Sequence, residues 1–152
     1  MGRELLIAFG IMGLCLVVHV TGMIFLGEEL LRQLKKIESR FGSAYAAIML
    51  LIVFSAIMVL HLGDAVIWAC FYDWGGLFQD FETSLYFSMQ SYSTVGYGDV
   101  LLPQKWRLLG TIEGVSGVLL CGLSAAFFFA IVNVMFRSRM QKLQRDQHKT
   151  QT

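Results

Sequence analysis

The sequence has little charge and almost no proline. Of its 152 residues, 15% are Asp, Glu, Lys or Arg and 56% are hydrophobic, whereas a soluble domain usually has about 25% charged residues. The formal net charge is only +1, which provides no general attraction for nucleic acid. The composition therefore predicts a membrane protein without a nucleic-acid partner.

The sequence also lacks the residue patterns of an enzyme. Cys15, Cys70 and Cys121 fall within apolar runs and show no CxxC spacing, so we interpret them as small core or lipid-facing residues. We find no nucleophile–base pair, metal-ligand cluster or phosphate-binding loop in the sequence. We therefore expect neither catalysis nor a cofactor.

Three apolar stretches are long enough to span a bilayer, which takes about 20 helical residues. They cover 5–27, 44–71 and about 104–136. A signal peptide is the alternative for the first stretch, but Glu4 adjoins Arg3 and no A-x-A-like cleavage site follows. We expect a retained helix over 1–27. No span carries Arg or Lys at every third position, which excludes a four-helix voltage sensor.

The distribution of positive charge predicts the orientation. The 28–43 connection and the C-terminal tail are basic, whereas 72–103 contains acidic residues but no Lys or Arg. Basic loops remain in the cytoplasm. We therefore expect an extracellular or periplasmic amino terminus and a cytoplasmic carboxyl terminus, in a plasma membrane or a bacterial inner membrane.

The 28–43 connection has apolar residues at helical spacing. We favour a separate cytoplasmic helix on the inner leaflet, where its cations bind anionic lipid headgroups. The alternative is a plain continuation of the first span. The cations are Arg32, Lys35, Lys36 and Arg40.

Residues 81–92 are apolar but too short to cross the membrane. A helix that enters without crossing must be followed by irregular backbone, which survives at membrane depth only in protein or beside a water-filled path. The sequence that follows, at 94–99, is Thr-Val-Gly-Tyr-Gly-Asp.

This hexapeptide suits the coordination of a dehydrated potassium ion. Successive carbonyl groups face one axis only if some residues adopt positive φ, which Gly96 and Gly98 allow. Thr94 adds a hydroxyl at the inner mouth, and we expect Val95 and Tyr97 to point away and pack the loop. Since one loop offers too few ligands, four copies must surround the axis.

At this point the chain resembles the potassium channel family, whose selectivity filter is built from Thr-Val-Gly-Tyr-Gly loops. The resemblance implies an all-α membrane protein: three transmembrane helices, a re-entrant pore helix and a filter loop, assembled as a fourfold homotetramer. It implies a pore domain over 44–137, with an outer helix at 44–71, a pore helix at 81–92, the filter at 94–99 and an inner helix at 104–137. The segment 138–152 is then a short basic cytoplasmic tail.

The resemblance also assigns functional residues. The oxygens of Thr94, Val95, Gly96 and Tyr97 would bind potassium, the permeant ion, with Gly98 completing the filter. Three residues would support it, and six would line the pore or gate it. The supporting residues are Gln90, Asp99 and Glu113; the pore-lining residues are Gly117, Val118, Cys121, Ala125, Phe129 and Asn133.

Some of these assignments leave alternatives open. Gln90 replaces a Glu of some bacterial members and is expected to donate to Asp99. Gly117 is either a hinge or a close-packing site, and Phe129 is a candidate hydrophobic constriction. Glu113 has either a functional role or, as we favour, a structural hydrogen bond to the pore helix.

Three other polar residues interrupt the spans. His61 and Asp64 are three apart and could interact on one helix face. Asp64 is expected near the outer interface, where water hydrates it. We interpret His19 as a neutral interhelical hydrogen bonder rather than a proton sensor.

Together these features predict a potassium-selective channel subunit that conducts passively and has no voltage sensor. One alternative is a weakly selective cation channel, against which Tyr97 argues. Another is a membrane accessory or scaffold subunit with a relict pore loop, against which the intact filter argues.

Overall fold

The computed structural model describes residues 2–37 and 43–150, and the described part is helical, without β-strands. Four α-helices and one short 3-10 helix follow in order: α1 (Gly2–Ile37), α2 (Ser43–Trp74), α3 (Phe81–Tyr92), η1 (Gln104–Trp106) and α4 (Arg107–Thr150). Three segments are long and apolar enough to cross a membrane: Gly2–Arg32, Ala46–Trp74 and Gln104–Ser138. The prediction of an all-α membrane protein with three spanning helices is confirmed.

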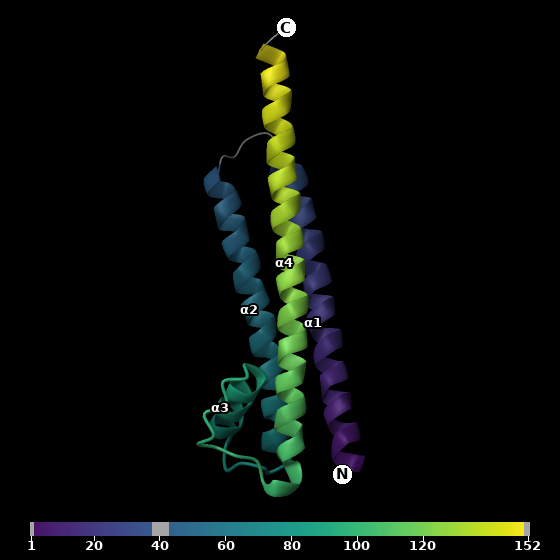
Figure 1. Cartoon of the computed structure of the whole chain (residues 1–152), viewed down its shortest axis with the longest axis vertical. Helices are drawn as coiled ribbons and strands as arrows, with labels where there is room; N and C mark the ends of the chain where they lie inside the picture. Colours follow the sequence, from purple (N-terminus) through teal and green to yellow (C-terminus); the bar gives the residue numbers. More distant parts are fainter. Residues whose placement is uncertain (1, 38–42, 151–152) are drawn as a thin grey trace.

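The three long helices lie side by side, and α3 lies at one end of the bundle (Figure 1). Each long helix contacts the other two, while α3 contacts α2 and α4. The amino terminus lies at the end that carries α3, and the carboxyl terminus lies at the other end. Lys105 approaches Glu4 to 3.9 Å there. The amino terminus and the filter segment therefore share one end, as the predicted topology requires.

The separate helix expected over 28–43 is not present, because α1 continues unbroken to Ile37. Residues 28–36 contain neither proline nor glycine and consist largely of good helix formers. Arg32 also lies 3.8 Å from Glu28 and 3.7 Å from Glu29, within the same helix. The continuation of the first span was thus the better interpretation. Arg40 lies outside the described residues.

The inner helix is longer than predicted. It was expected to end at 137, but α4 runs to Thr150 and includes most of the tail. Residues 138–150 contain no glycine or proline to end the helix.

The short helix α3 has the predicted bounds because its ends are capped. The Asp80 side chain accepts a hydrogen bond from the Thr83 N–H at 2.7 Å, as an N-cap residue does. At the other end, the Ser93 N–H donates to the carbonyl oxygen of Met89 at 3.1 Å. The helix therefore ends at Tyr92, two residues before Thr94.

An aromatic core holds α3 against the long helices. Tyr72 of α2 and Phe87 of α3 are buried, and their ring centroids lie 5.3 Å apart in an edge-to-face arrangement, a favourable geometry. Trp68 of α2 and Leu109 of α4 are fully buried in the same core. The core thus fixes the helix that leads into the filter segment.

Candidate functional site

Every second residue of the filter segment adopts positive φ. The values are 60° at Thr94, 53° at Gly96 and 77° at Gly98. Glycine accepts this region at little cost, whereas a β-branched residue such as Thr94 is strained there. Such strain is typical of functional sites. The two glycines therefore serve the backbone role that the sequence predicted, and Thr94 shares it.

Two hydrogen bonds join Gln90 of α3 to the filter segment, residues 94–99. Its carbonyl oxygen accepts from the Gly96 N–H at 3.1 Å, and its side-chain Oε1 accepts from the Tyr97 N–H at 2.9 Å. Because Gln90 is buried, these bonds tie two consecutive residues of the loop to the last turn of α3. The supporting role predicted for Gln90 agrees with this geometry.

The main hydrogen-bond partner of Asp99 is Tyr86, and the expected partner Gln90 makes a smaller contribution to lowering the pKa of Asp99. The Tyr86 hydroxyl donates to Asp99 Oδ2 at 2.7 Å, while the Gln90 side chain is turned toward Tyr97. The Tyr86 bond lowers the pKa of Asp99 below its ordinary value, because it stabilises the carboxylate. Tyr86 is a supporting residue that the sequence reasoning did not name.

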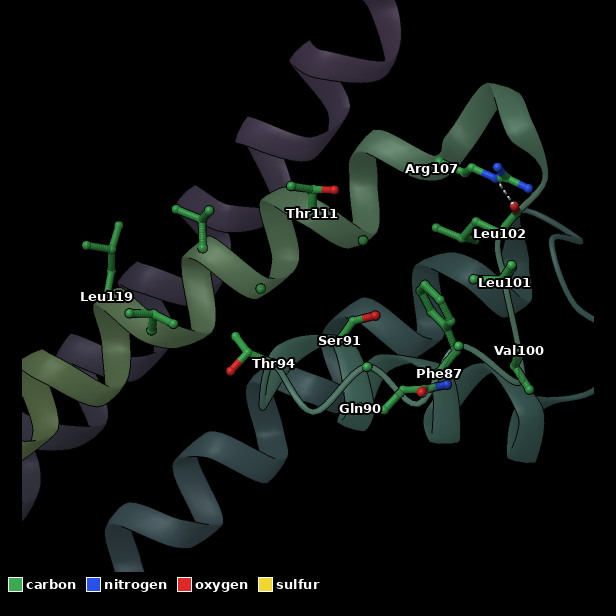
Figure 2. Close-up of a pocket in the computed structure, with 16 residues that line it drawn as sticks. Phe87, Gln90, Ser91, Thr94, Val100, Leu101, Leu102, Arg107, Thr111 and Leu119 are labelled. Carbon is green, nitrogen blue, oxygen red and sulfur yellow. Dashed lines mark hydrogen bonds between the residues drawn. The ribbon is translucent and has the colours of Figure 1, made fainter.

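An apolar groove lies between the filter segment and α4. Figure 2 shows Gln90 and Thr94 on one side of it, with Thr111 and Leu119 of α4 on the other. Its volume is about 600 Å³. Tyr97 was expected to be packed, but its side chain is 74% exposed in the single chain. The single chain therefore leaves the filter segment and the groove beside it partly exposed.

Glu113 forms the structural contact that the sequence favoured. Its carboxyl group is fully buried; Oε2 accepts from the Tyr72 hydroxyl at 2.7 Å, and Oε1 lies 2.5 Å from Ser88 Oγ. Glu113 thus joins α4 to α2 and to α3. The Ser88 hydroxyl also lies 2.7 Å from the Ala65 carbonyl oxygen, and one proton cannot serve two acceptors. Each donor has its own acceptor when the Glu113 carboxyl carries a proton and donates it to Ser88 Oγ, while Ser88 donates to the Ala65 carbonyl oxygen.

Gly117 of α4 lies in close contact with the end of α3. A Cβ at this glycine would lie 2.0 Å from the carbonyl oxygen of Tyr92, and the residue is buried. Of the two alternatives for Gly117, this contact favours the close-packing site, because α4 lies directly against the end of α3 at this residue. The other five predicted pore-lining residues are exposed: Val118, Cys121, Ala125, Phe129 and Asn133.

A buried polar network joins α1 to the end of α3. His19 Nδ1 lies 2.6 Å from Asp64 Oδ2, and the Tyr92 hydroxyl donates to the same oxygen at 3.0 Å. His61 Nδ1 lies 2.8 Å from the Tyr92 hydroxyl, and His19 Nε2 lies 2.7 Å from Ser124 Oγ. Asp64 is therefore fully buried, and the expectation that water hydrates it is wrong.

One assignment of protons is consistent with all four of these contacts. Each histidine donates from Nδ1, His61 to the Tyr92 hydroxyl and His19 to Asp64, while Ser124 donates to His19 Nε2. Asp64 Oδ2 then accepts from two donors, His19 and Tyr92. The predicted interaction of His61 with Asp64 exists only through Tyr92, which bridges them.

The residues missed from the sequence are Tyr86, Tyr92 and Ser124. Tyr92 had a usable signal, because it lies two residues before Thr94, at a helix end that must be held in place. The ionisable residues in the spans were also a signal for partners inside the bundle, but their pairing depends on helix register.

A family model described as an ion channel matches residues 46–134, which is more than half of the chain. The chain therefore belongs to this ion channel family, and it is an ion channel subunit with a multi-pass membrane fold. Neither a curated protein nor a solved structure gives a significant match.

Proposed function

We propose that the chain conducts potassium selectively and passively through a pore formed by four copies. The observation that carries this proposal is the backbone of 94–99, where positive φ recurs at Thr94, Gly96 and Gly98. Alternating backbone conformations allow successive carbonyl groups to face one axis. Filters of potassium channels replace the hydration shell of the ion with such oxygens.

The incomplete cover of the filter segment supports an assembly. Val95 is 53% exposed and Tyr97 is 74% exposed, and the apolar groove beside them leaves this flank open. Large exposed apolar surfaces mark interaction sites. Neighbouring copies would cover these side chains and bring four loops to the axis. The apolar side chains would then brace each filter segment.

The exposed stripe of α4 supports a pore-lining role for this helix. Val118, Cys121, Ala125 and Phe129 lie on it, uncovered by the other described helices. Phe129 is 66% exposed and, facing an axis in four copies, would form a hydrophobic constriction that closes by dewetting.

Anionic lipid is a further proposed partner, through Arg32, Lys35, Lys36 and Arg40. Arg32 is the last residue of the first spanning segment, and the extension of α1 to Ile37 carries Lys35 and Lys36 beyond it. Arg32 is exposed but has Glu28 and Glu29 within 4 Å, so its attraction for anionic lipid is weakened. The proposal therefore rests mainly on the other cations.

Two other functions remain distinguishable by experiment. A weakly selective cation channel would pass sodium and potassium alike, and an accessory subunit would pass neither. The purified full chain in liposomes should take up potassium far faster than sodium. Gly96→Ala should abolish this selective flux, because a Cβ at φ of 53° is strained even though the space around it is open.

Gly122→Ala is the matched control, since Gly122 lies in α4 and no packed neighbour in the described part of the chain lies within 4 Å of the added Cβ. It should keep wild-type flux. Unchanged selectivity in Gly96→Ala would show that the filter segment does not set it, and wild-type sodium uptake equal to potassium uptake would favour the weakly selective channel.

A further inference from the structure

The buried cluster where α1, α2 and α3 meet contains the donor set of a metal site. His19, His61 and Asp64 each offer one ligand atom, and these three atoms lie within 4.8 Å of one another. Two imidazoles and one carboxylate suit Zn²⁺ and related divalent transition ions. We propose that His19, His61 and Asp64 form a binding site for a zinc-class divalent ion.

The distances in the cluster are close to those of a metal site. Along the chain of contacts, His19 Nδ1 to Asp64 Oδ2 is 2.6 Å, Asp64 Oδ2 to the Tyr92 hydroxyl is 3.0 Å, and the hydroxyl to His61 Nδ1 is 2.8 Å. Ligands about 2.1 Å from a tetrahedral metal lie about 3.4 Å apart. To admit an ion, His19 Nδ1 and Asp64 Oδ2 must therefore move apart by less than about 1 Å. The Tyr92 hydroxyl must also leave its place between Asp64 and His61.

Two features of the surroundings favour a cation here. His19 Nε2 lies 2.7 Å from Ser124 Oγ, which is the partner that a metal-bound imidazole needs for its other nitrogen. In the described part of the chain, the buried Oδ1 of Asp64 has no hydrogen-bond partner. A buried carboxylate oxygen of this kind is costly unless something compensates it, and a bound cation would do so.

The site also has an entrance. His61 is only half-buried, and the exposed Cys121 places its Sγ 4.0 Å from His61 Nε2. A thiol is a donor that zinc-class ions accept readily, so an ion arriving along the exposed face of α4 meets Cys121 first. Access of this kind is one of the requirements for a real metal site.

Binding at this site would act on the end of the pore helix. The Tyr92 hydroxyl now bridges Asp64 and His61, and an ion held by these two residues takes over both of its partners. Tyr92 is the last residue of α3 and lies two residues before Thr94. The site therefore connects metal binding to the support of the filter segment.

The test is the binding of Co²⁺, a spectroscopic substitute for Zn²⁺, to the tag-free full chain in detergent. Wild type should bind one ion per chain with the absorption of a tetrahedral site, and Zn²⁺ should displace it. His19→Gln and His61→Gln should each weaken binding more than about 100-fold, since they remove a ligand. His148→Gln, outside the cluster, is the matched control and should bind like wild type.

A wild-type chain that binds no Co²⁺, or unchanged binding in His61→Gln, would overturn the proposal and leave a plain hydrogen-bond network. If the histidine variants do not fold, Tyr92→Phe decides, because it keeps all three ligands. It should bind about tenfold more tightly, since the hydroxyl no longer competes for Asp64 and His61. Equal or weaker binding in Tyr92→Phe would also contradict the proposal. Because the experiment measures metal binding and not ion flux, a negative result would leave the proposed potassium conduction untouched.

Discussion

Replacing Gly117 by alanine should destabilise the protein although alanine is the better helix former. The added Cβ would lie 2.0 Å from the Tyr92 carbonyl oxygen and 3.0 Å from its carbonyl carbon. Both atoms belong to the backbone, so no flexible side chain can move aside. To restore normal contact, α4 and the end of α3 must separate by more than about 1 Å, and overpacking of this kind costs about 3 kcal/mol.

The gain in helix propensity offsets only part of that cost. It amounts to about 1 kcal/mol, which leaves a net loss of about 2 kcal/mol. For a chain of this size, the midpoint of thermal unfolding should fall by about 4–8 °C. Thermal unfolding of the detergent-purified protein measures it. Selective flux should also fall, because the displaced carbonyl belongs to Tyr92, next to the filter segment.

Gly122→Ala is the control on the same helix, because its Cβ would meet open space. It should unfold at the wild-type temperature or up to about 4 °C above it. If Gly117→Ala were as stable as Gly122→Ala, the close contact between α4 and the pore helix would be refuted.

Three further predictions concern the supporting residues and the topology. Glu113→Gln should keep wild-type stability and flux, since an amide can donate a hydrogen bond to Ser88 as a protonated carboxyl does. Glu113→Ala should lower the free energy of unfolding by about 3 kcal/mol, because buried hydroxyl groups lose their partner. Equal denaturation midpoints for the two variants would contradict this. Tyr86→Phe should raise the pKa of Asp99 toward its ordinary value, because the hydroxyl holds that pKa down. The bond stabilises the carboxylate form, so its contribution is present above the ordinary pKa and is lost as the pH falls through the lowered one. A proton titration of Asp99 that is identical in both proteins would count against it. A cysteine introduced at position 2 should react with an impermeant reagent in intact cells; labelling only after lysis would place the amino terminus inside.

The parts of the fold that follow from chain-local chemistry could be predicted from the sequence. The three spans follow from apolar length, and the bounds of α3 follow from the Asp80 cap and the filter motif behind it. The positive φ at Gly96 follows from the need for facing carbonyl groups. Each of these features depends on residues close together in sequence, so no knowledge of packing is needed.

The parts that depend on the register between helices could not be predicted. His19 and Asp64 are 45 residues apart, and nothing in either helix alone shows that they meet. The role of Gly117 likewise depends on how closely α4 approaches Tyr92. The continuation of α1 past Glu28 was open to sequence reasoning, but the amphipathic pattern was given more weight than the absence of a helix breaker.

The central claim is that four copies of this chain form a potassium-selective pore, and a reversal potential tests it most directly. The purified protein should be incorporated into a planar bilayer with potassium on one side and sodium on the other. The proposed function predicts single-channel currents that reverse close to the potassium equilibrium potential, and that lose this selectivity in Gly96→Ala. A reversal potential near zero in wild type, showing equal passage of sodium and potassium, would contradict it.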